Sequence, residues 1–508
     1  MPDNSSNTKR IAKNTVFLYI RMIVILVINL YTSRIVLQLL GVEDFGIYNV
    51  VGGIVTFLSF LNAALSNGSS RFITFEMGKK EGGNVHGVFQ SSFIAHVILA
   101  FIIVVLAETG GIWFLYNKLV IPPDRIEAAV FAYHCSIITS LVTITQVPYT
   151  ALIISNENMG IYAYVSILEA VLKLSVVFLL LYSPIDKLKY YAILLCVVQI
   201  SIAMIYRFYC VRKYRESSLH NLKADWRKIK EIVSFSSWSL FGNASHALNG
   251  QGLTIITNIF FSPAVVAARA LSVQVNNAAM NLIQNLITAA NPQIVKLYAS
   301  GEQEKSRNLM LNTTRYSFLM MLLLSVPLIC ACDEIMRLWL VAVPKFTVIF
   351  VRLILIQSLF FTFDTCFYNG LYACGRVKQN AIISPSLYVL QFIVTYFLFE
   401  LGFSPIALSV VGILTSAVAG ILVKPFLLKR LAGCTYTSVY AVITRCLIAA
   451  LIALPVPLYL MYSLSDGWTG ALLKASLGFL ISLVVAIFVG INSEERKLAL
   501  NYVAKKFR

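Results

Sequence analysis

Charged side chains are scarce in this 508-residue sequence: they make up 13% of it, and only 23 residues are Asp or Glu. Hydrophobic residues account for 58%, and the mean hydropathy is +0.78. No water-soluble globular domain of this length has such a balance, so a soluble fold is excluded. Most of the surface is expected to face lipid.

Other features that the sequence lacks narrow the chemistry. It has no Gly-rich loop ending in Lys-Ser or Lys-Thr, so a built-in nucleotide motor is not indicated. Its nine cysteines show neither zinc-type nor disulfide-like spacing, and we interpret them as buried small side chains. The longest expected external loops, residues 108–125 and 332–345, could not house a separate domain. We therefore predict that the protein is not an enzyme and has no cofactor.

Long apolar segments recur along the chain. A hydrocarbon layer of about 30 Å takes roughly 20 apolar residues per helical crossing. This criterion predicts about 14 transmembrane helices and an all-α polytopic membrane protein. The expected spans are residues 14–40, 46–72, 88–107, 127–154, 161–182, 190–209, 232–261, 263–295, 309–331, 346–372, 381–400, 405–428, 440–462 and 472–491.

The net charge of +18 could suggest a nucleic-acid partner, but its distribution favours a membrane topology. If successive loops alternate between the two sides, about 27 of the Lys and Arg residues fall on one side and about 6 on the other. This bias predicts that both termini are cytoplasmic. Attraction to anionic lipid headgroups is expected as well, and nucleic-acid binding is not.

The chain has an internal organisation that resembles a duplication. Weakly similar turns and polar loops recur at an offset of about 220 residues, as in duplicated transporter folds. We expect two pseudo-symmetric six-helix lobes around a central cavity, followed by two additional C-terminal helices. The predicted parts are an N-terminal lobe at 1–210, a cytoplasmic connector at 211–231, a C-terminal lobe at 232–430, and the last two helices with a basic tail at 431–508.

The end of the connector has an amphipathic pattern. Trp226, Ile229 and Ile232 recur at helical spacing beside Arg227 and Lys230. This pattern suits a helix that lies in the headgroup region of a membrane. A solvated linker is the alternative.

Three charged residues lie deep within expected membrane spans. Glu169 and Lys173 are four residues apart and are expected to share one helix face as an ion pair. Asp364 lies between Phe363 and Thr365. Charges at such depth cost roughly 2.5 to 3.5 kcal/mol each. We interpret Lys173 as a candidate substrate ligand and Glu169 and Asp364 as candidates for ion coupling, with a purely structural role as the alternative.

Five arginines lie closer to the expected helix ends. Their side chains could reach the headgroups, or they could together form a cationic cavity. Guanidinium groups suit bidentate binding of phosphate oxygens, which makes the set a candidate phosphate site. The residues are Arg21, Arg34, Arg269, Arg315 and Arg352.

Carboxamides recur at intervals of three and four in two neighbouring spans. Gln274, Asn277 and Asn281 place an amide stripe on one face of the span at 263–295, and Asn243 lies on the span before it. Such groups need partners within a membrane. Those partners are either neighbouring helices or the hydroxyl groups of a sugar.

Several short motifs resemble those of Wzx-type polysaccharide flippases, which export O-antigen or capsule repeat units. They are Ser33-Arg34, the turn Leu40-Gly41-Val42-Glu43-Asp44-Phe45-Gly46, the run Asn67-Gly68-Ser69-Ser70-Arg71 and the pair Asn291-Pro292. The motifs are degenerate, and their order along nearly the whole chain makes the resemblance specific. The wider group also contains multidrug and toxin extruders and the lipid II flippase.

This resemblance implies a substrate and a mechanism. An undecaprenyl-pyrophosphate-linked oligosaccharide would cross from the cytoplasmic to the outer leaflet by alternating access, for the assembly of surface polysaccharide such as lipopolysaccharide. Its pyrophosphate would be held by arginines, Arg34 by motif and Arg21 and Arg269 by position, whereas Lys173 and Asp364 rest on their depth alone. Membrane lipids, a polysaccharide polymerase and assembly proteins are the implied partners.

Three other functions are alternatives to this one. An ion-coupled drug or metabolite antiporter of the same fold would prefer an acidic lumen. A membrane glycosyltransferase or polymerase would need acidic residues on a sizeable external loop, and the sequence has no such loop. A non-transporting scaffold would tolerate apolar replacements of all the deep charges. The coupling ion, proton or sodium, cannot be assigned because we find no match to the coupling residues of drug extruders.

Overall fold

The structure is a computed structural model of the 508-residue chain. It describes residues 4–78, 83–156, 158–220, 222, 225–340, 342–375, 378–455, 459, 467–491 and 496, and among these the side chains from Val24 onward except those of residues 159, 238, 239, 289 and 292. The described residues form helices joined by short loops, without a β-strand. The predicted all-α class is therefore confirmed.

Eleven helices of the described chain are long and apolar enough to cross a membrane, so the protein is a multi-pass membrane protein. The predicted number of about 14 is not confirmed. Three expected spans are missing from the eleven, namely 46–72, 232–261 and 263–295. All three positions are helical, but polar side chains lower their hydropathy.

The chain divides into two compact units, Met1–Ala267 and Ala268–Arg508, which we call the first and the second unit. The division falls after the expected connector at 211–231, because the helix that follows the connector packs on helices of the first unit. The six-helix lobes stay a prediction. Elements of the first unit are α1 (Asn4–Phe57), α2 (Ser59–Gly78), α3 (Val85–Leu106), η1 (Ala107–Gly111), α4 (Ile112–Asn117), η2 (Pro123–Arg125), α5 (Ile126–Ser155), α6 (Met159–Leu180), α7 (Lys187–Lys213), η3 (Arg215–Ser217), α8 (Trp226–Ala247), η4 (Leu248–Gly252) and α9 (Leu253–Phe260).

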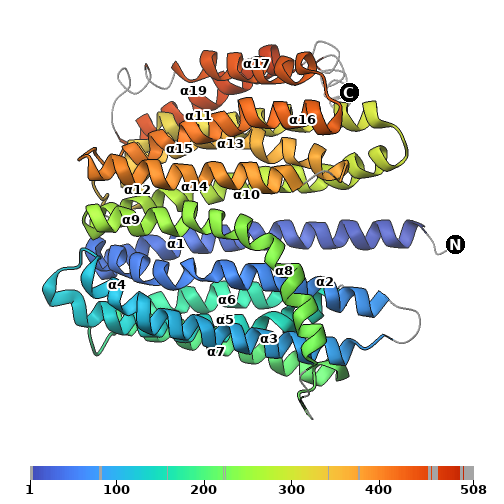
Figure 1. The fold of residues 1–508 in the computed structure, drawn as a ribbon. Helices are drawn as coiled ribbons and strands as arrows, with labels where there is room; N and C mark the ends of the chain where they lie inside the picture. Colours follow the sequence, from blue (N-terminus) through green and yellow to red (C-terminus); the bar gives the residue numbers. More distant parts are fainter. Residues whose placement is uncertain are drawn as a thin grey trace. The chain divides into compact units, whose positions relative to one another are not determined.

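In the first unit, α5 lies along α7, α1 packs on α5 and α6, and α2 packs on α8 (Figure 1). The core between α1 and α5 contains Ile47, Val51, Ala129, Ala132 and Tyr133, all inaccessible to solvent. Small alanines on α5 allow α1 to approach closely, and the Tyr133 hydroxyl donates a hydrogen bond to the carbonyl oxygen of Ala107 at 2.8 Å.

Two breaks bend the N-terminal helices. Gly41 interrupts α1 with φ of 83°, a conformation that side-chain-bearing residues rarely adopt. This position lies in the turn motif at residues 40–46. A second break separates α1 from α2 at Leu58, within the expected span 46–72. Side-chain hydroxyls of Thr56 and Ser59 bond backbone carbonyls around this break.

The second unit is built around α11 and α13, with α17 and α19 packed on α11. The rings of Phe318 and Phe363 stack with centroids 4.9 Å apart between α11 and α13. Lys474 of α19 forms a buried ion pair with Glu334 of α12. Elements of this unit are α10 (Pro263–Ala299), which begins in the first unit, α11 (Gln303–Cys330), α12 (Cys332–Trp339), α13 (Thr347–Ala373), α14 (Lys378–Glu400), α15 (Ala407–Ala417), η5 (Val418–Val423), α16 (Lys424–Ala432), α17 (Tyr436–Ala453), α19 (Trp468–Val485) and η6 (Ala486–Gly490).

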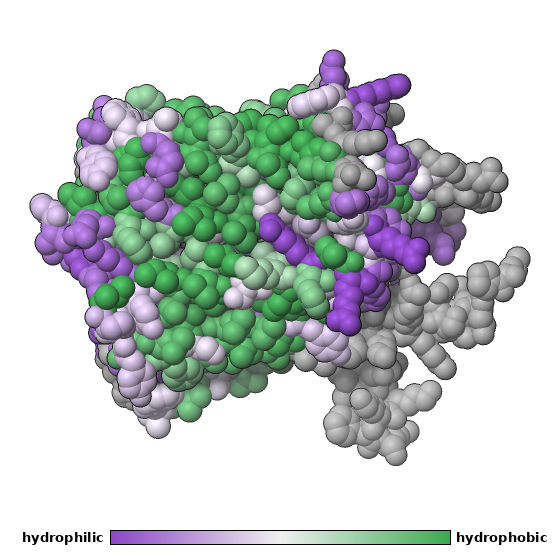
Figure 2. Space-filling view, turned by 90° about the horizontal axis from the view of Figure 1, so that it is seen from below, coloured by the Kyte–Doolittle hydropathy of each residue, from purple (hydrophilic) through white to green (hydrophobic). Residues whose placement is uncertain are grey.

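The surface has the polarity of a membrane protein. On the face drawn in Figure 2, hydrophobic side chains form a broad field between two hydrophilic ends. Large apolar side chains such as Phe101 and Phe208 are exposed. In water such a surface would aggregate, whereas in lipid it is the expected exterior.

Candidate functional site

The first unit contains a polar cavity of about 610 Å³. It lies among α1, α2 and α5, with one residue each from α7 and the π-helical turn η4. Such π turns are frequent at functional sites. The lining residues are Tyr48, Asn49, Gly52, Gly53, Val55, Thr56, Ser59, Asn62, Ala63, Ser66, Cys135, Ser136, Thr139, Ser140, Thr143, Ile144, Ala192 and Gln251.

The helix period explains why these side chains converge. On α5, Ser136, Thr139, Ser140 and Thr143 follow one another at intervals of three, one and three, which places four hydroxyl groups on one face. On α1 and α2, the polar lining residues from Asn49 to Ser66 recur every three to seven residues across the break at Leu58. Two polar stripes therefore face a common space.

The cavity offers hydrogen bonds without charge. The hydroxyls of Ser136 and Thr143 donate to the carbonyl oxygens of Ala132 and Thr139, at 2.9 and 2.8 Å, and keep acceptor capacity for a ligand. The side-chain oxygen of Asn62 is buried and has no hydrogen-bond partner in the described structure. None of the lining residues is acidic or basic. The arrangement suits a neutral ligand that is rich in hydroxyl groups.

This cavity was not predicted, and none of the predicted site residues lines it. The signal was nevertheless present in the sequence. The spacing rule that identified the amide stripe at 274–281 also identifies the hydroxyl stripe at 136–143. Ser and Thr are common in membrane helices because their hydroxyl groups can bond the helix backbone. The hydroxyl stripe therefore could not be told apart from ordinary helix residues in the sequence.

The predicted site residues of the first unit whose side chains are described do not line the cavity. Arg34 is exposed on α1, and the side chain of Arg21 lies outside the described residues. Asn243 is half-buried on α8. The predicted ion pair on α6 is confirmed, with Lys173 Nζ 2.7 Å from Glu169 Oε1. Both side chains of this pair are partly exposed.

Predicted site residues of the second unit lie on three helices. On α10, Arg269 is buried, Gln274 is half-buried, and Asn277 and Asn281 are exposed. Their roles as ligands stay a prediction.

Arg315 and Arg352 lie on α11 and α13. Arg315 is buried and donates a hydrogen bond to the side-chain oxygen of Asn312 at 3.1 Å. Arg352 forms an ion pair with Asp333 on α12. A phosphate that bound Arg352 would have to compete with this carboxylate.

Asp364 belongs to a buried polar cluster of the second unit. Its Oδ1 lies 3.3 Å from Nζ of Lys424, and its Oδ2 accepts a hydrogen bond from the Tyr388 hydroxyl at 3.3 Å. Lys424 also donates to the side-chain oxygen of Asn380 at 2.5 Å. Lys424, which is only 1% exposed, was not among the predicted site residues. The pair neutralises two charges that would each be costly in hydrocarbon.

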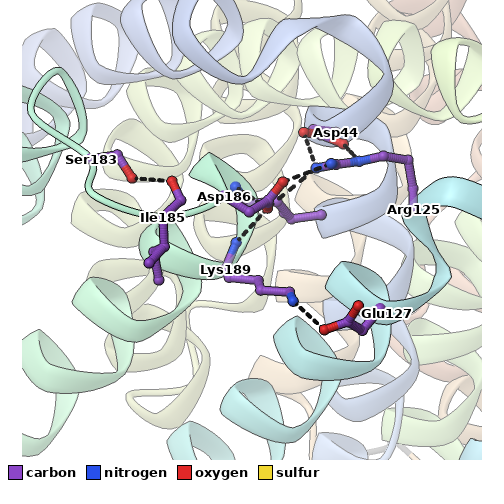
Figure 3. A network of polar contacts seen from close by, with 8 residues as sticks. Asp44, Arg125, Glu127, Ser183, Ile185, Asp186 and Lys189 are labelled. Atoms are coloured by element: carbon purple, nitrogen blue, oxygen red, sulfur yellow. Dashed lines mark hydrogen bonds and ion pairs between the residues drawn. The ribbon is translucent and has the colours of Figure 1, made fainter.

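Asp44 of the turn motif takes part in an ion-pair network with residues of other elements (Figure 3). Arg125 Nε donates to Asp44 Oδ1 at 2.8 Å and Nη1 donates to Asp186 Oδ2 at 2.7 Å. Asp186 also accepts from the backbone N–H groups at the start of α7. Beside it, Lys189 pairs with Glu127 at 2.5 Å. Arg125 thus joins the turn of α1 to the beginnings of α5 and α7.

The environment of Asp186 changes its pKa. Partial burial alone would raise the pKa of this carboxyl, but hydrogen bonds from Arg125 and from the backbone N–H groups outweigh burial. The pKa of Asp186 is therefore below its usual value. The carboxylate is ionised at neutral pH and stabilises the turn.

The fold is that of known membrane transporters. An inward-facing multidrug resistance MATE family transporter of the MOP superfamily has a TM-score of 0.70 at 14% identity, over 82% of this chain and 99% of that chain. The lipid II flippase MurJ, in an inward closed conformation, has a TM-score of 0.61 at 13% identity, over 94% and 98%. A MOP superfamily transporter from Pyrococcus furiosus has a TM-score of 0.60 at 15% identity, over 83% and 97%.

Sequence comparison defines the family. Residues 9–298, more than half of the chain, match the family described as polysaccharide biosynthesis protein, and residues 239–397 match the MatE family. No curated protein matches the chain. The protein belongs to the polysaccharide biosynthesis protein family, in agreement with the resemblance that the motifs indicated.

Proposed function

We propose that the protein is a flippase for an undecaprenyl-pyrophosphate-linked oligosaccharide. It moves this lipid from the cytoplasmic to the outer leaflet of the bacterial inner membrane, with both termini in the cytoplasm, and so serves surface polysaccharide assembly such as that of O-antigen. Membership of the polysaccharide biosynthesis protein family supports this proposal. The similarity to the fold of MurJ, over 94% of this chain, agrees with it.

The uncharged polar cavity of the first unit is the observation that carries the proposal. A saccharide presents many hydroxyl groups and no charge, and the Ser, Thr, Asn and Gln side chains of the cavity can donate to and accept from them. A carboxylate in the cavity wall would favour a cationic drug. The lining contains none.

The pyrophosphate needs cations, which the cavity does not supply. In the proposed mechanism it pairs with arginines of the predicted lumen, foremost Arg34 and Arg269, while the polyprenyl tail stays in lipid. Alternating access then carries the sugar across. A polysaccharide polymerase and assembly proteins would receive the exported unit.

An ion-coupled drug or metabolite antiporter is the second candidate. The match of residues 239–397 to the MatE family favours it, as does the TM-score of 0.70 to a MATE transporter. Under this alternative the buried Asp364 would bind a proton or sodium ion.

The leaflet distribution of undecaprenyl-linked oligosaccharide in cells depleted of the protein tests the proposal. We expect the lipid to accumulate on the cytoplasmic side, and wild-type protein to relieve this accumulation. Normal exposure on the outer side after depletion would contradict the flippase and favour the antiporter. We also expect that depletion leaves ethidium efflux from the same cells unchanged.

A further inference from the structure

The motif Asn67–Arg71 on α2 forms a contact surface for α8. A Cβ atom at Gly68 would lie 2.3 Å from Ser236 Oγ and 3.2 Å from the carbonyl oxygen of Ile232, so only glycine lets α8 approach this closely. On the other side of α2, Ser69 accepts a buried hydrogen bond from Ser92 of α3 at 2.6 Å. The motif therefore fixes the position of α2 between two neighbours.

Arg71, the last residue of the motif, is exposed and lies over aromatic rings. Its Cζ is 4.1 Å from the ring centroid of Phe235 on α8 and 5.9 Å from that of Phe72. The two rings meet edge to face, with centroids 6.1 Å apart. Cation–π contact holds the guanidinium at the surface and leaves its N–H donors available to an anion.

The same two rings line an open notch of about 620 Å³ between α2 and α8. The other lining residues are Arg227, Lys230, Glu231 and Ser234. Arg227 lies 3.6 Å from Glu231, which offsets one charge. With Arg71 beside them, three cations face one carboxylate, so the notch attracts anions.

The surroundings of the notch combine this charge with exposed apolar surface. Trp226 at the start of α8 is 66% exposed, and Val233 and Phe235 are exposed as well. Ile229 and Ile232 point the other way and are buried against Leu65 and Ala95. These two isoleucines therefore contact α2 and α3 and do not form the apolar face of a surface helix. Trp226, in contrast, has the exposure that a residue at the membrane interface needs.

We propose that this notch, together with Arg71 over its two aromatic rings, is a binding site for the phosphate headgroup of an anionic phospholipid. The cations bind the phosphate, and the exposed aromatic and aliphatic side chains contact the acyl chains. The predicted topology places this end of the first unit at the cytoplasmic leaflet, where anionic lipids attract Lys and Arg. The assignment is independent of the substrate that the protein transports.

Native mass spectrometry of the full-length protein in detergent tests the site. The protein is titrated with dioleoyl phosphatidylglycerol or with dioleoyl phosphatidylcholine, and the fraction carrying one lipid is measured. We expect wild type to prefer phosphatidylglycerol, and each of Arg71→Gln, Arg227→Gln and Lys230→Gln to lower that preference by up to about fivefold. Lys230→Arg keeps the charge and should retain the preference.

Arg212→Gln is the matched control, because Arg212 also lies over an aromatic ring, that of Phe208, but has no part in the notch. Thermal unfolding of each variant shows that it is folded, and added salt should weaken the wild-type preference. An unchanged preference in the folded triple variant Arg71→Gln, Arg227→Gln, Lys230→Gln would overturn the proposal. The proposal would also be overturned if the triple variant lost binding of undecaprenyl pyrophosphate but still bound phosphatidylglycerol as wild type does.

Discussion

Arg125 binds Asp44 through two nitrogens, Nε at 2.8 Å from Oδ1 and Nη2 at 2.5 Å from Oδ2. This fork geometry is specific to arginine, and a lysine could not reproduce it. The aspartate of the turn motif therefore has a structural partner at the start of α5. Its presence in the motif is explained without a role in substrate binding.

Replacing Arg125 by alanine should destabilise the protein. The change leaves Asp44 and Asp186 close together without their cation, and we expect a loss of about 2 to 3 kcal/mol in unfolding free energy. Lys189→Ala is the control, with an expected loss of about 0.5 kcal/mol, because its partner Glu127 is 87% exposed. Unfolding of the purified protein in detergent measures both, and equal losses would contradict this account of the network.

The lowered pKa of Asp186 predicts how its contribution depends on pH. Because the folded pKa lies below the unfolded value near 3.8, the stabilisation is present above pH 3.8 and is lost as the pH falls through the folded pKa. Asp186→Asn keeps a helix-capping side chain but removes the charge. The difference in thermal stability between wild type and this variant should stay constant from about pH 7 to about pH 5 and shrink below the unfolded pKa. A difference that already vanishes at about pH 5 would show that another group is responsible.

The buried pair of Asp364 and Lys424 predicts a non-additive result. Asp364→Asn alone leaves an uncompensated buried ammonium group and should cost about 3 to 5 kcal/mol. The double variant Asp364→Leu, Lys424→Met should recover most of this loss. If Asp364 serves ion coupling, the double variant will fold but transport will no longer respond to a proton or sodium gradient. A wild-type gradient response in the double variant would leave the pair with a structural role only.

The two arginines that we propose as pyrophosphate ligands, Arg34 and Arg269, differ in burial, so their variants should affect protein stability differently. Arg34 is exposed, so Arg34→Ala should leave the amount of protein in the membrane unchanged while lowering export about tenfold. Arg269 is buried, so Arg269→Ala should reduce both. Exported polysaccharide and membrane-protein level are measured together, with exposed Arg212→Ala as control. Wild-type export in both arginine variants would remove their proposed role.

The cavity predicts a loss of affinity when a hydroxyl is removed. Thr139→Val preserves side-chain shape, and we expect about fivefold weaker apparent affinity for the lipid-linked saccharide. Thr444→Val is the control, because Thr444 is exposed on α17, does not line the cavity, and donates its hydroxyl to a backbone carbonyl at 2.7 Å. Export as a function of substrate supply compares the two. Equal effects of both changes would exclude the cavity from binding.

Local patterns of the sequence predicted much of the fold. Apolar length predicted the spanning helices, and Gly41 predicted the turn, because both depend on residues near one another in the chain. The break at Leu58 has no glycine or proline at that position, so no local signal predicted it. The three polar helical regions do not meet the hydropathy criterion because of their polar side chains, so that they span the membrane stays a prediction.

Ion pairs could also be predicted only where both residues lie close together in the sequence. The pair of Glu169 and Lys173 was predicted because one helical turn separates them. Lys424 pairs with Asp364 from a different helix, and only the packing of α13 with α16 brings them together. Residue spacing predicts the helix face on which a polar stripe lies. It does not predict whether that face packs against another polar stripe or faces lipid.

Transbilayer movement in vesicles tests the central claim most directly. The purified protein is reconstituted with undecaprenyl-pyrophosphate-linked oligosaccharide, with a proton or sodium gradient imposed, and a glycosidase added outside measures the glycan that reaches the outer leaflet. We predict that wild type delivers inner-leaflet glycan to the enzyme and that Ser140→Phe, which fills the cavity, does not. Failure of folded wild type to move any lipid-linked saccharide, while it transports ethidium, would contradict the account.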